Sequence, residues 1–336
     1  MVRLREHFNQ LLESQDGPAY SRRLNPVDAV FAFRLFLGRN PDATHELPGL
    51  LDSEQTLREF LSDLLNSSEF SRQPGFFPPN RLLMAELDAF RLWFNSSDRE
   101  MGARMALGQY ESRPVQSLTR ALRPGMRCVD AGAHIGFYTC LMAAAVGEAG
   151  AVYAFEPVPA SYDLLVRNIR ENRFEGRAFA YRAACSDTAG PLSMSLVSTM
   201  CVAGDVGGAE RTTVAAVRVD EVVQGPIDVI KLDVEGHEPA AIRGMARIIE
   251  RDRPTIFSEV NEYWLRTCSA SSGREYVQFL ESLGYEVYDM TNGQRLASGG
   301  LQLDILETMD VMALPSFRSS TASTSAATVR ARAEII

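Results

Sequence analysis

From Pro124 onward the chain alternates between short apolar stretches and helical stretches, and this alternation constrains the fold more than any other feature. Helices between successive strands predict a largely parallel sheet, because parallel neighbours need a crossover connection. The last two strands have only a loop-rich connection, so we expect a hairpin there. We therefore predict an α/β fold whose seven-stranded sheet is mostly parallel and has an antiparallel C-terminal hairpin strand. The expected strands are 127–131, 151–155, 178–183, 227–233, 255–260, 285–290 and 310–314.

The segments on either side of this region follow other patterns, which divides the chain into four parts. We predict an N-terminal helical domain over 1–75, a linker and entrance segment over 76–123, the sheet domain over 124–315 and a disordered tail over 316–336. In the helical domain, Pro26 is expected to open one helix, and Asp52 with Gln55 to cap a second. The tail is rich in Ser, Thr and Ala and has too few large apolar side chains to pack.

Composition excludes several classes of protein. The net charge of −9 argues against a protein that follows a nucleic-acid backbone. The five cysteines are widely spaced and form no C-x-x-C pair, which suggests neither a zinc site nor a disulfide framework and fits a reducing cytoplasm. The first ten residues lack the apolar core of a signal peptide, and no apolar run is long enough to cross a membrane.

The first strand of the sheet domain runs into a glycine-containing loop, CVDAGAHIGFYT from Cys128 to Thr139. Gly132 and Gly136 allow the backbone to turn sharply and to approach a ligand closely. Their G-x-x-x-G spacing differs from the G-x-G-x-x-G that cradles a diphosphate, which favours a nucleoside ligand without one. Two glycines after a strand are also compatible with a plain strand-to-helix turn.

Two further acidic residues follow strands in the positions that a nucleoside site needs. The second strand ends in Glu156-Pro157, a little over 20 residues past the glycine loop, where a carboxylate can accept hydrogen bonds from both ribose hydroxyls. Asp187 follows the third strand and either accepts from the exocyclic amine of an adenine or serves only as a turn residue. These two interpretations of Asp187 stay open at this stage.

The fourth strand is unusual because it carries charges where a central strand is normally apolar. Alternation in IDVIKLDVEGHEP (227–239) places Lys231, Asp233 and Glu235 on one side, and Lys231 with Asp233 could form a buried ion pair. Open α/β sheets bind ligands at the carboxyl ends of their strands. If the next strand, which ends at Glu259, is a neighbour, four carboxylates and one histidine converge on one rim; they are Asp233, Glu235, Glu238, Glu259 and His237.

These motifs resemble the FkbM family of methyltransferases in their order and spacing. The matching stretches are WFNSSDREMGARMALGQYE (93–111), VDAGAHIGFYT (129–139), YAFEPVPASYDLLVRNI (153–169), IDVIKLDVEGHE (227–238) and RPTIFSEV (253–260). The resemblance implies a Rossmann-like class I methyltransferase domain, S-adenosylmethionine as cofactor and O-methyl transfer to a sugar, a glycolipid or a secondary metabolite. The N-terminal region is similar, more weakly, to a small helical domain found beside bacterial glycan-modifying enzymes.

The resemblance also implies roles for individual residues. Asp130, Gly132 and Gly136 surround the methionine end of the cofactor, Glu156 holds the ribose, and the loop 233–238 faces the substrate. His134 stands where many members have Asn or another polar residue. The full set expected at the cofactor is Asp130, Gly132, His134, Gly136, Thr139, Glu156, Pro157, Asp187 and Asp233.

A sugar hydroxyl is a poor nucleophile, so we expect a general base. His237 is the first candidate because the pKa of histidine lies near neutrality. Asp233, Glu235 and Glu259 are alternative bases or orienting acceptors. The same carboxylates could bind Mg²⁺, although nothing in their spacing specifies that metal. Residues 197–213 lack a strong pattern and could line or cover the acceptor pocket.

Two other kinds of function compete with this interpretation. One is an NAD-dependent oxidoreductase, which the glycine spacing disfavours. The other is a non-catalytic protein of a glycan-assembly complex, in which the N-terminal helices dock a glycosyltransferase or mediate self-association. For the enzyme itself we expect a small-molecule or glycan acceptor, no nucleic acid and no stable membrane insertion.

Overall fold

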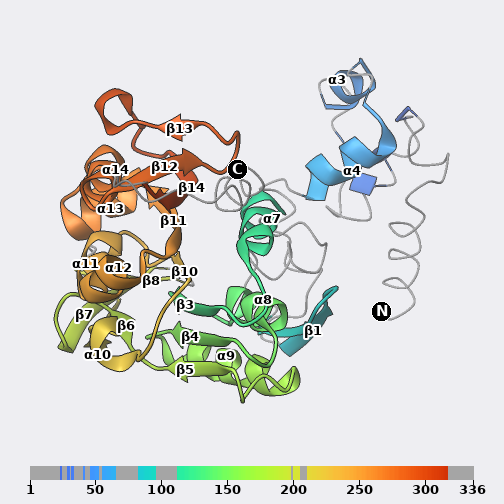
Figure 1. Cartoon of the computed structure of the whole chain (residues 1–336). Helices are drawn as coiled ribbons and strands as arrows, with labels where there is room; N and C mark the ends of the chain where they lie inside the picture. Colours follow the sequence, from blue (N-terminus) through green and yellow to red (C-terminus); the bar gives the residue numbers. More distant parts are fainter. Residues whose placement is uncertain are drawn as a thin grey trace, which may run out of the picture. The chain divides into compact units, whose positions relative to one another are not determined.

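The computed structural model describes residues 23–24, 29–30, 32–33, 41, 46–52, 55–65, 82–95, 112–197, 200–204 and 210–316 (Figure 1). The chain divides into two compact units. The smaller comprises Met1–Arg81 with Ser96–Ala103, and the larger comprises Leu82–Asn95 with Arg104–Ile336. The larger unit thus includes residues of the predicted entrance segment. Of the predicted linker and entrance segment, residues 82–95 and 112–123 are described, and the tail after Ser316 lies outside the described residues.

The smaller unit is helical where it is described. It contains α3 (Glu46–Asp52) and α4 (Leu57–Leu65). The capping box predicted at Asp52 and Gln55 is wrong, because α3 ends at Asp52 and the box is formed by Thr56 and Glu59. The Thr56 amide donates to Glu59 at 2.8 Å, and the Glu59 amide donates to the Thr56 hydroxyl at 3.3 Å. Threonine at the N-cap and glutamate three residues on are the residues that this motif prefers.

The apolar stripe of α4 packs into a small core, as predicted. Phe60 and Leu64 are buried together with Leu24, Ala29, Ala32 and Phe33, and the rings of Phe33 and Phe60 are stacked. Of the first predicted helix, only residues 29–30 and 32–33 are described, and its cap at Asn25 and Pro26 lies outside them.

The larger unit is built on an eight-stranded sheet with the order β13-β12-β14-β11-β10-β3-β4-β5. Its strands are β3 (Arg127–Ala131), β4 (Ala151–Phe155), β5 (Ala178–Tyr181), β10 (Val229–Leu232), β11 (Thr255–Asn261), β12 (Tyr285–Asp289), β13 (Arg295–Leu296) and β14 (Thr308–Pro315). Neighbours from β5 to β11 are parallel, whereas β14 is antiparallel to both β11 and β12. The predicted Rossmann-like α/β fold and the antiparallel C-terminal strand are confirmed, with β13 as one strand more than the seven expected.

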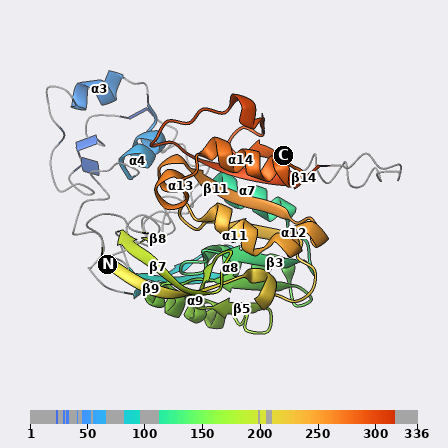
Figure 2. The same cartoon turned by 90° about the vertical axis from the view of Figure 1, so that its left-hand side faces the viewer.

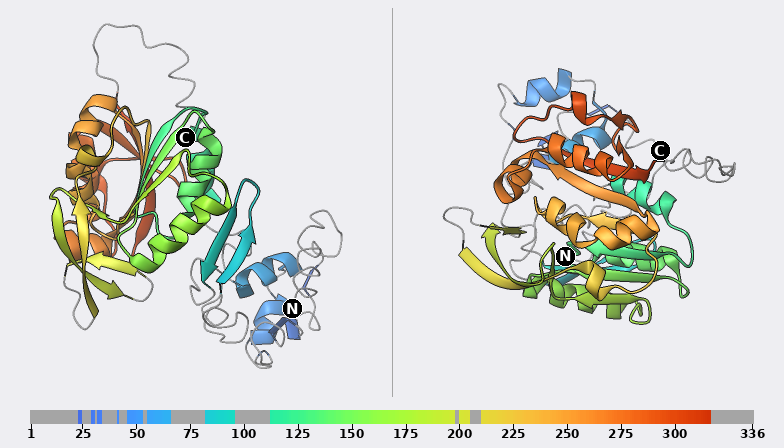
Figure 3. Two further views of the ribbon diagram at one scale, coloured as in Figure 1. Left: turned by 90° about the horizontal axis from the view of Figure 1, so that it is seen from below. Right: turned by 60° about the vertical axis from the view of Figure 1, so that its left-hand side comes forward.

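Helices cover both faces of this sheet, as Figures 2 and 3 show. One face carries α8 (Phe137–Val146) and α9 (Pro159–Glu171), with α7 (Ser112–Ala121) against α8. The other carries α11 (Glu238–Gly244), α12 (Ala246–Asp252), α13 (Glu262–Ser269) and α14 (Gly273–Ser282). Apolar strand residues such as Ile230, Leu232 and Ile256 are fully buried in the largest core cluster. Crossovers on both faces explain why the central strands are nearly continuous in apolar residues.

A second sheet with the order β6-β9-β7-β8 was not predicted from the sequence. It is formed by β6 (Ala184–Cys185), β7 (Gly190–Val197), β8 (Met200–Ala203) and β9 (Glu210–Val217). Leu192 and Met194 of β7 alternate with serines. Ser195 is buried, and its hydroxyl is satisfied there by donating a hydrogen bond to the Gly204 carbonyl. Such alternation is the signal of a half-buried strand.

The hairpin of β1 (Leu82–Glu86) and β2 (Arg91–Asn95) docks on α9 through two asparagines. The Asn168 amide group accepts from the Trp93 backbone amide at 2.6 Å and donates to the Trp93 carbonyl at 2.9 Å. Asn172 makes the same pair of contacts with Arg91, each at 2.7 Å. A side-chain amide has the same donor and acceptor groups as a peptide bond. The two asparagines therefore form hydrogen bonds with the backbone amides and carbonyls at the edge of β2, as a neighbouring strand would.

Candidate active site

The glycine loop after β3 lies against the end of β10. Gly132 has a φ of 85°, and a Cβ added there would lie 1.7 Å from the Asp233 carbonyl oxygen. Gly136 has a φ of 91°, and a Cβ there would lie 2.6 Å from the end of the Leu165 side chain of α9. Gly132 therefore requires glycine for conformation and for space, and Gly136 chiefly for conformation.

Glu156, at the end of β4, ties this loop to the second strand. Its two carboxylate oxygens accept hydrogen bonds from the backbone amides of His134 and Val158, each at 2.8 Å. Burial raises the pKa of Glu156 to about 7 despite these hydrogen bonds. His134 adopts a left-handed conformation with a φ of 48° and contributes this amide to the Glu156 contact. Pro157, beside Glu156, is partly buried.

Asp130 is the buried acid at the base of the loop. The hydroxyl of Thr139, in the first turn of α8, donates to its carboxylate. Burial raises the pKa of Asp130 to about 6, while Lys231, its register partner on β10, acts to lower it. The structure thus brings together Asp130, Gly132, His134, Gly136, Thr139 and Glu156, all predicted at the cofactor.

The ion pair predicted on the fourth strand is present. The Lys231 ammonium lies 3.0 Å from the Asp233 carboxylate and 4.8 Å from the centre of the Tyr138 ring. The predicted alternation ends earlier than expected, because β10 stops at Leu232. Glu235 is no longer at a strand position and has a left-handed φ of 53°.

Glu238 closes the loop that carries Asp233 and Glu235. It is the first residue of α11, and its Oε1 accepts from the backbone amides of Val234 at 3.1 Å and Gly236 at 3.2 Å. Its Oε2 is buried without a hydrogen-bond partner among the described residues. Burial raises the pKa of Glu238 to about 7.

Glu259 belongs to the same acidic rim. β10 and β11 are parallel neighbours, as predicted, so Glu259 follows the partner of Leu232 and comes beside Asp233. Burial, and then the nearby charges of Asp233 and Glu235, raise the pKa of Glu259 well above neutrality, so its carboxyl group is neutral at pH 7.

Asp310, which the sequence interpretation missed, lies directly opposite Glu259 on β14. The signal was a single carboxylate between Met309 and Val311 in the last apolar strand. Asp310 also lines a small cavity with Lys231 and Tyr138.

His237 does not join this rim. Strand parity places Lys231 and Glu259 on the face covered by α7 and α8, because Lys231 packs against Tyr138. Ser258 points to the opposite face, where its hydroxyl lies 2.9 Å from the Tyr276 hydroxyl of α14.

His237 belongs to that opposite face. Its Nε2 lies 3.1 Å from the Ser186 hydroxyl. The charges acting on His237 are Asp187 and Arg243, and burial lowers its pKa below the ordinary value. The expected meeting of one histidine with four carboxylates is therefore not what the structure shows.

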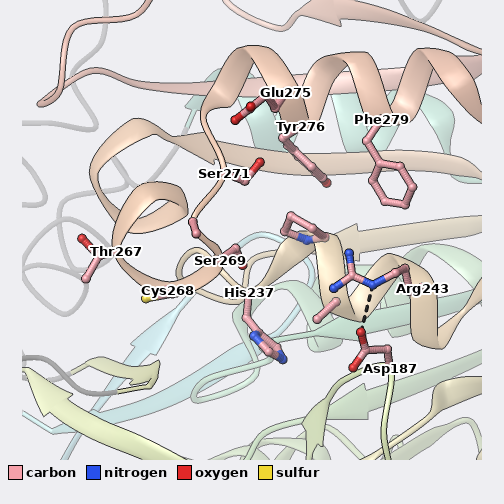
Figure 4. Close-up of a pocket in the computed structure, with 13 residues that line it drawn as sticks. Asp187, His237, Arg243, Thr267, Cys268, Ser269, Ser271, Glu275, Tyr276 and Phe279 are labelled. Carbon is pink, nitrogen blue, oxygen red and sulfur yellow. Dashed lines mark hydrogen bonds and ion pairs between the residues drawn. The ribbon is translucent and has the colours of Figure 1, made fainter.

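Asp187 is engaged by protein groups. Its carboxylate forms an ion pair with Arg243 at 2.8 Å, and its carbonyl accepts from Arg218 at 2.5 Å. Figure 4 shows the Asp187–Arg243 pair beside His237 in a groove lined by α11 and α14. Asp187, like Asp233, is thus a residue expected at the cofactor whose charge is already paired within the protein.

The donor set fits a nucleoside better than a metal or a diphosphate. Among the described residues, no group of three or more His, Cys, Asp or Glu is arranged to hold a metal ion. Across the described ranges, buried carboxylates surround the loop, and the nearby Lys231 is already paired with Asp233. The glycine cradle, the Glu156 carboxylate and the acidic rim suit a ligand with hydroxyl donors and a positive centre.

Comparisons with known proteins agree with the motifs. Residues 130–287 match the model of the methyltransferase FkbM domain. The chain is 30% identical over 127 residues to the hexuronic acid methyltransferase AglP of Haloferax volcanii; the match covers 36% of this chain and 50% of that protein. The chain thus spans about half the length of this curated relative.

Solved structures resemble the chain at low identity. A methyltransferase FkbM from Methylobacillus flagellatus KT is 13% identical, with a TM-score of 0.38 over 66% of this chain and 55% of that chain. Aeropyrum pernix fibrillarin, solved with bound S-adenosyl-L-methionine, is 16% identical, with a TM-score of 0.38 over 61% and 75%. In the part of the chain that the structure describes, no helix has the length and apolar character of a membrane span.

Proposed function

Because the chain carries a methyltransferase domain of the FkbM family, we propose that it transfers the methyl group of S-adenosylmethionine to a hydroxyl of a sugar. The observation that carries this proposal is the joining of the glycine loop, Glu156 and the acidic rim at one edge of the sheet. The similarity to AglP, a hexuronic acid methyltransferase, supports a sugar as the acceptor.

We assign the cofactor to the edge formed by the ends of β3, β4 and β10. Gly132 and Gly136 let the loop pack closely against Asp233 and Leu165, and Glu156 is placed to accept hydrogen bonds from ribose hydroxyls. Each Glu156 oxygen receives one backbone hydrogen bond and keeps a lone pair for a further donor. When bound, S-adenosylmethionine supplies an electrophilic methyl group on a positively charged sulfur.

The residue best placed to take the proton of the acceptor hydroxyl is Asp233. Its side chain is 30% exposed, whereas Lys231, which holds it, is buried. Glu259 is a weaker candidate for this base, because burial and the neighbouring carboxylates raise its pKa. His237, the first candidate from the sequence, faces Ser186 and Asp187 and is assigned a binding role.

The experiment that tests the proposed function uses a methyl donor with an isotopic label. The full chain is incubated with labelled S-adenosylmethionine and a glycan extract, and sugars are analysed by mass spectrometry. We expect a labelled O-methyl sugar that is absent when Asp233→Asn replaces the wild type. Label on protein, nucleic acid or nitrogen alone would overturn the assignment of the acceptor.

A further inference from the structure

A groove of about 750 Å³ opens on the face of the larger unit that carries α11 and α14. It is lined by α11, the end of α13, the turn 269–272 and α14. This face is opposite to the one on which Lys231 and Glu259 lie. The groove is therefore distinct from the acidic rim. His237 lies at the edge of the groove, two residues after Glu235 in the loop that also carries Asp233.

Two features of opposite character face each other across the groove. Figure 4 shows the Phe279 ring and the Arg243–Asp187 ion pair turned toward the same hollow. Arg243 is half-exposed, with a side-chain exposure of 53%, and Asp187 engages its Nε. Hydroxyls of Thr267, Ser269 and Ser271 lie along another part of the lining.

The charges of the groove exclude an anionic ligand. Its charged side chains are Asp187, Glu275 and Arg243, and burial lowers the pKa of His237, which keeps that imidazole neutral at pH 7. The sum is one negative charge, and the only cation is already paired. A phosphate or a carboxylate would meet net repulsion there.

A wholly apolar ligand is also disfavoured. It would remove water from the Arg243–Asp187 ion pair without replacing the hydrogen bonds of these charged groups to water. A neutral ring with many hydroxyls avoids both the charge repulsion and the loss of hydrogen bonds, because its hydroxyls donate to carboxylates and accept from guanidinium groups. Its C–H face can lie on an aromatic ring.

We propose that this groove binds a neutral, polyhydroxylated ring, a hexose unit. The inference rests on the proposed function in one respect, because a glycan acceptor supplies such units beyond the one that is methylated. Phe279 forms the apolar platform, and Arg243 with Asp187 forms the polar wall. A volume of this size matches the usual range for small-ligand pockets.

The test is a calorimetric titration of the full chain, saturated with S-adenosylhomocysteine, with maltose, lactose and glucuronic acid. We expect one of the two neutral disaccharides to bind and glucuronic acid to bind more weakly. Phe279→Ala should weaken disaccharide binding by about tenfold. The matched control is Phe179→Ala, which removes an aromatic ring that is 40% exposed on β5, outside the groove, and should leave binding unchanged.

Three results would overturn the proposal. The first is that neither disaccharide binds to the wild type, and the second is that the two phenylalanine variants have equal effects on disaccharide binding. The third is a loss of S-adenosylhomocysteine affinity in Phe279→Ala, which would make the groove part of the cofactor site. Should Phe279→Ala fail to fold, Arg243→Gln tests the polar wall of the groove at a half-exposed position, and unchanged disaccharide binding in that variant would overturn the proposal. Failure of the proposed function gives a different result, because the wild type then does not bind S-adenosylhomocysteine. The sugar titration is in that case carried out without S-adenosylhomocysteine.

Discussion

The Lys231 ammonium and the Asp233 carboxylate form an ion pair at 3.0 Å, in which the lysine is buried and the aspartate is partly exposed to solvent. The Lys231 side chain is 5% exposed and the Asp233 side chain 30%. A buried cation without a partner is costly, so the lysine fixes the aspartate while leaving it accessible. Beside this pair, burial and the charges of Asp233 and Glu235 raise the pKa of Glu259, which favours its neutral form.

Asp233→Asn should abolish most methyl transfer while leaving cofactor binding nearly intact. The amide keeps the size of the side chain but cannot take a proton, so we expect kcat to fall by about 10² or more. Labelled methyl transfer measures kcat, and calorimetry with S-adenosylhomocysteine measures binding. Asp163→Asn, at an exposed position on α9, is the control. Normal turnover in Asp233→Asn would remove this residue as the base.

Gly132→Ala should destabilise the protein much more than Gly147→Ala. Both glycines have positive φ, 85° and 66°, and Gly147 has a ψ of −168°, so both alanine variants carry backbone strain of about 1–3 kcal/mol. Only at Gly132 would the new Cβ meet another atom, the Asp233 carbonyl at 1.7 Å; at Gly147 nothing lies within 4 Å. Chemical denaturation measures both free energies of unfolding. Equal losses would show that the loop does not press against Asp233.

Glu156→Ala should weaken binding of S-adenosylhomocysteine by about tenfold or more, because it removes the acceptor for the ribose hydroxyls and releases the His134 amide. Glu156→Gln should lie between alanine and wild type, since the amide keeps one acceptor oxygen. Calorimetry checks both variants against Glu148→Gln, an exposed position. An unchanged affinity in Glu156→Ala contradicts the ribose assignment.

The burial of the Glu238 carboxyl group should make the free energy of unfolding depend on pH. Burial raises its pKa from 4.5 to about 7, so the folded state holds a proton that the unfolded state releases. The stabilisation is complete below about pH 4.5 and is lost as the pH rises through 7. Glu238→Gln resembles the protonated form and should flatten this slope by about 1–3 kcal/mol between pH 5 and 8.

Chemical denaturation at pH 5, 6, 7 and 8 measures that slope. Glu250→Gln, exposed on α12, serves as the control. An identical slope in Glu238→Gln and wild type would mean that the buried carboxyl group titrates normally.

The main sheet could be predicted because its strands carry strong local signals. β3 and β4 are apolar runs that end in Asp130 and Glu156, and the helices between them have their own periodicity. The lysine and aspartate of the fourth strand could be paired from alternation alone, since two residues on one strand face share a side. The strand order then brought Glu259 beside Asp233.

Other features depend on geometry that one sequence does not carry. The direction of His237 depends on the turn that contains the left-handed Glu235 and Gly236, after which its imidazole lies beside Ser186. Asp310 meets Glu259 only through antiparallel pairing across 51 residues of chain. The small sheet around β7 shows alternation, but its serines at 193 and 195 resemble a loop until the pairing with β9 is known.

The most direct test of the central claim is titration of the full chain with S-adenosylhomocysteine and, separately, with NAD⁺. A nucleoside site at the edge of β3 and β4 predicts one-to-one binding of S-adenosylhomocysteine, with a dissociation constant on the order of micromolar, and no measurable binding of NAD⁺ at the same concentration. Tighter binding of NAD⁺, or no binding of S-adenosylhomocysteine, would contradict the account.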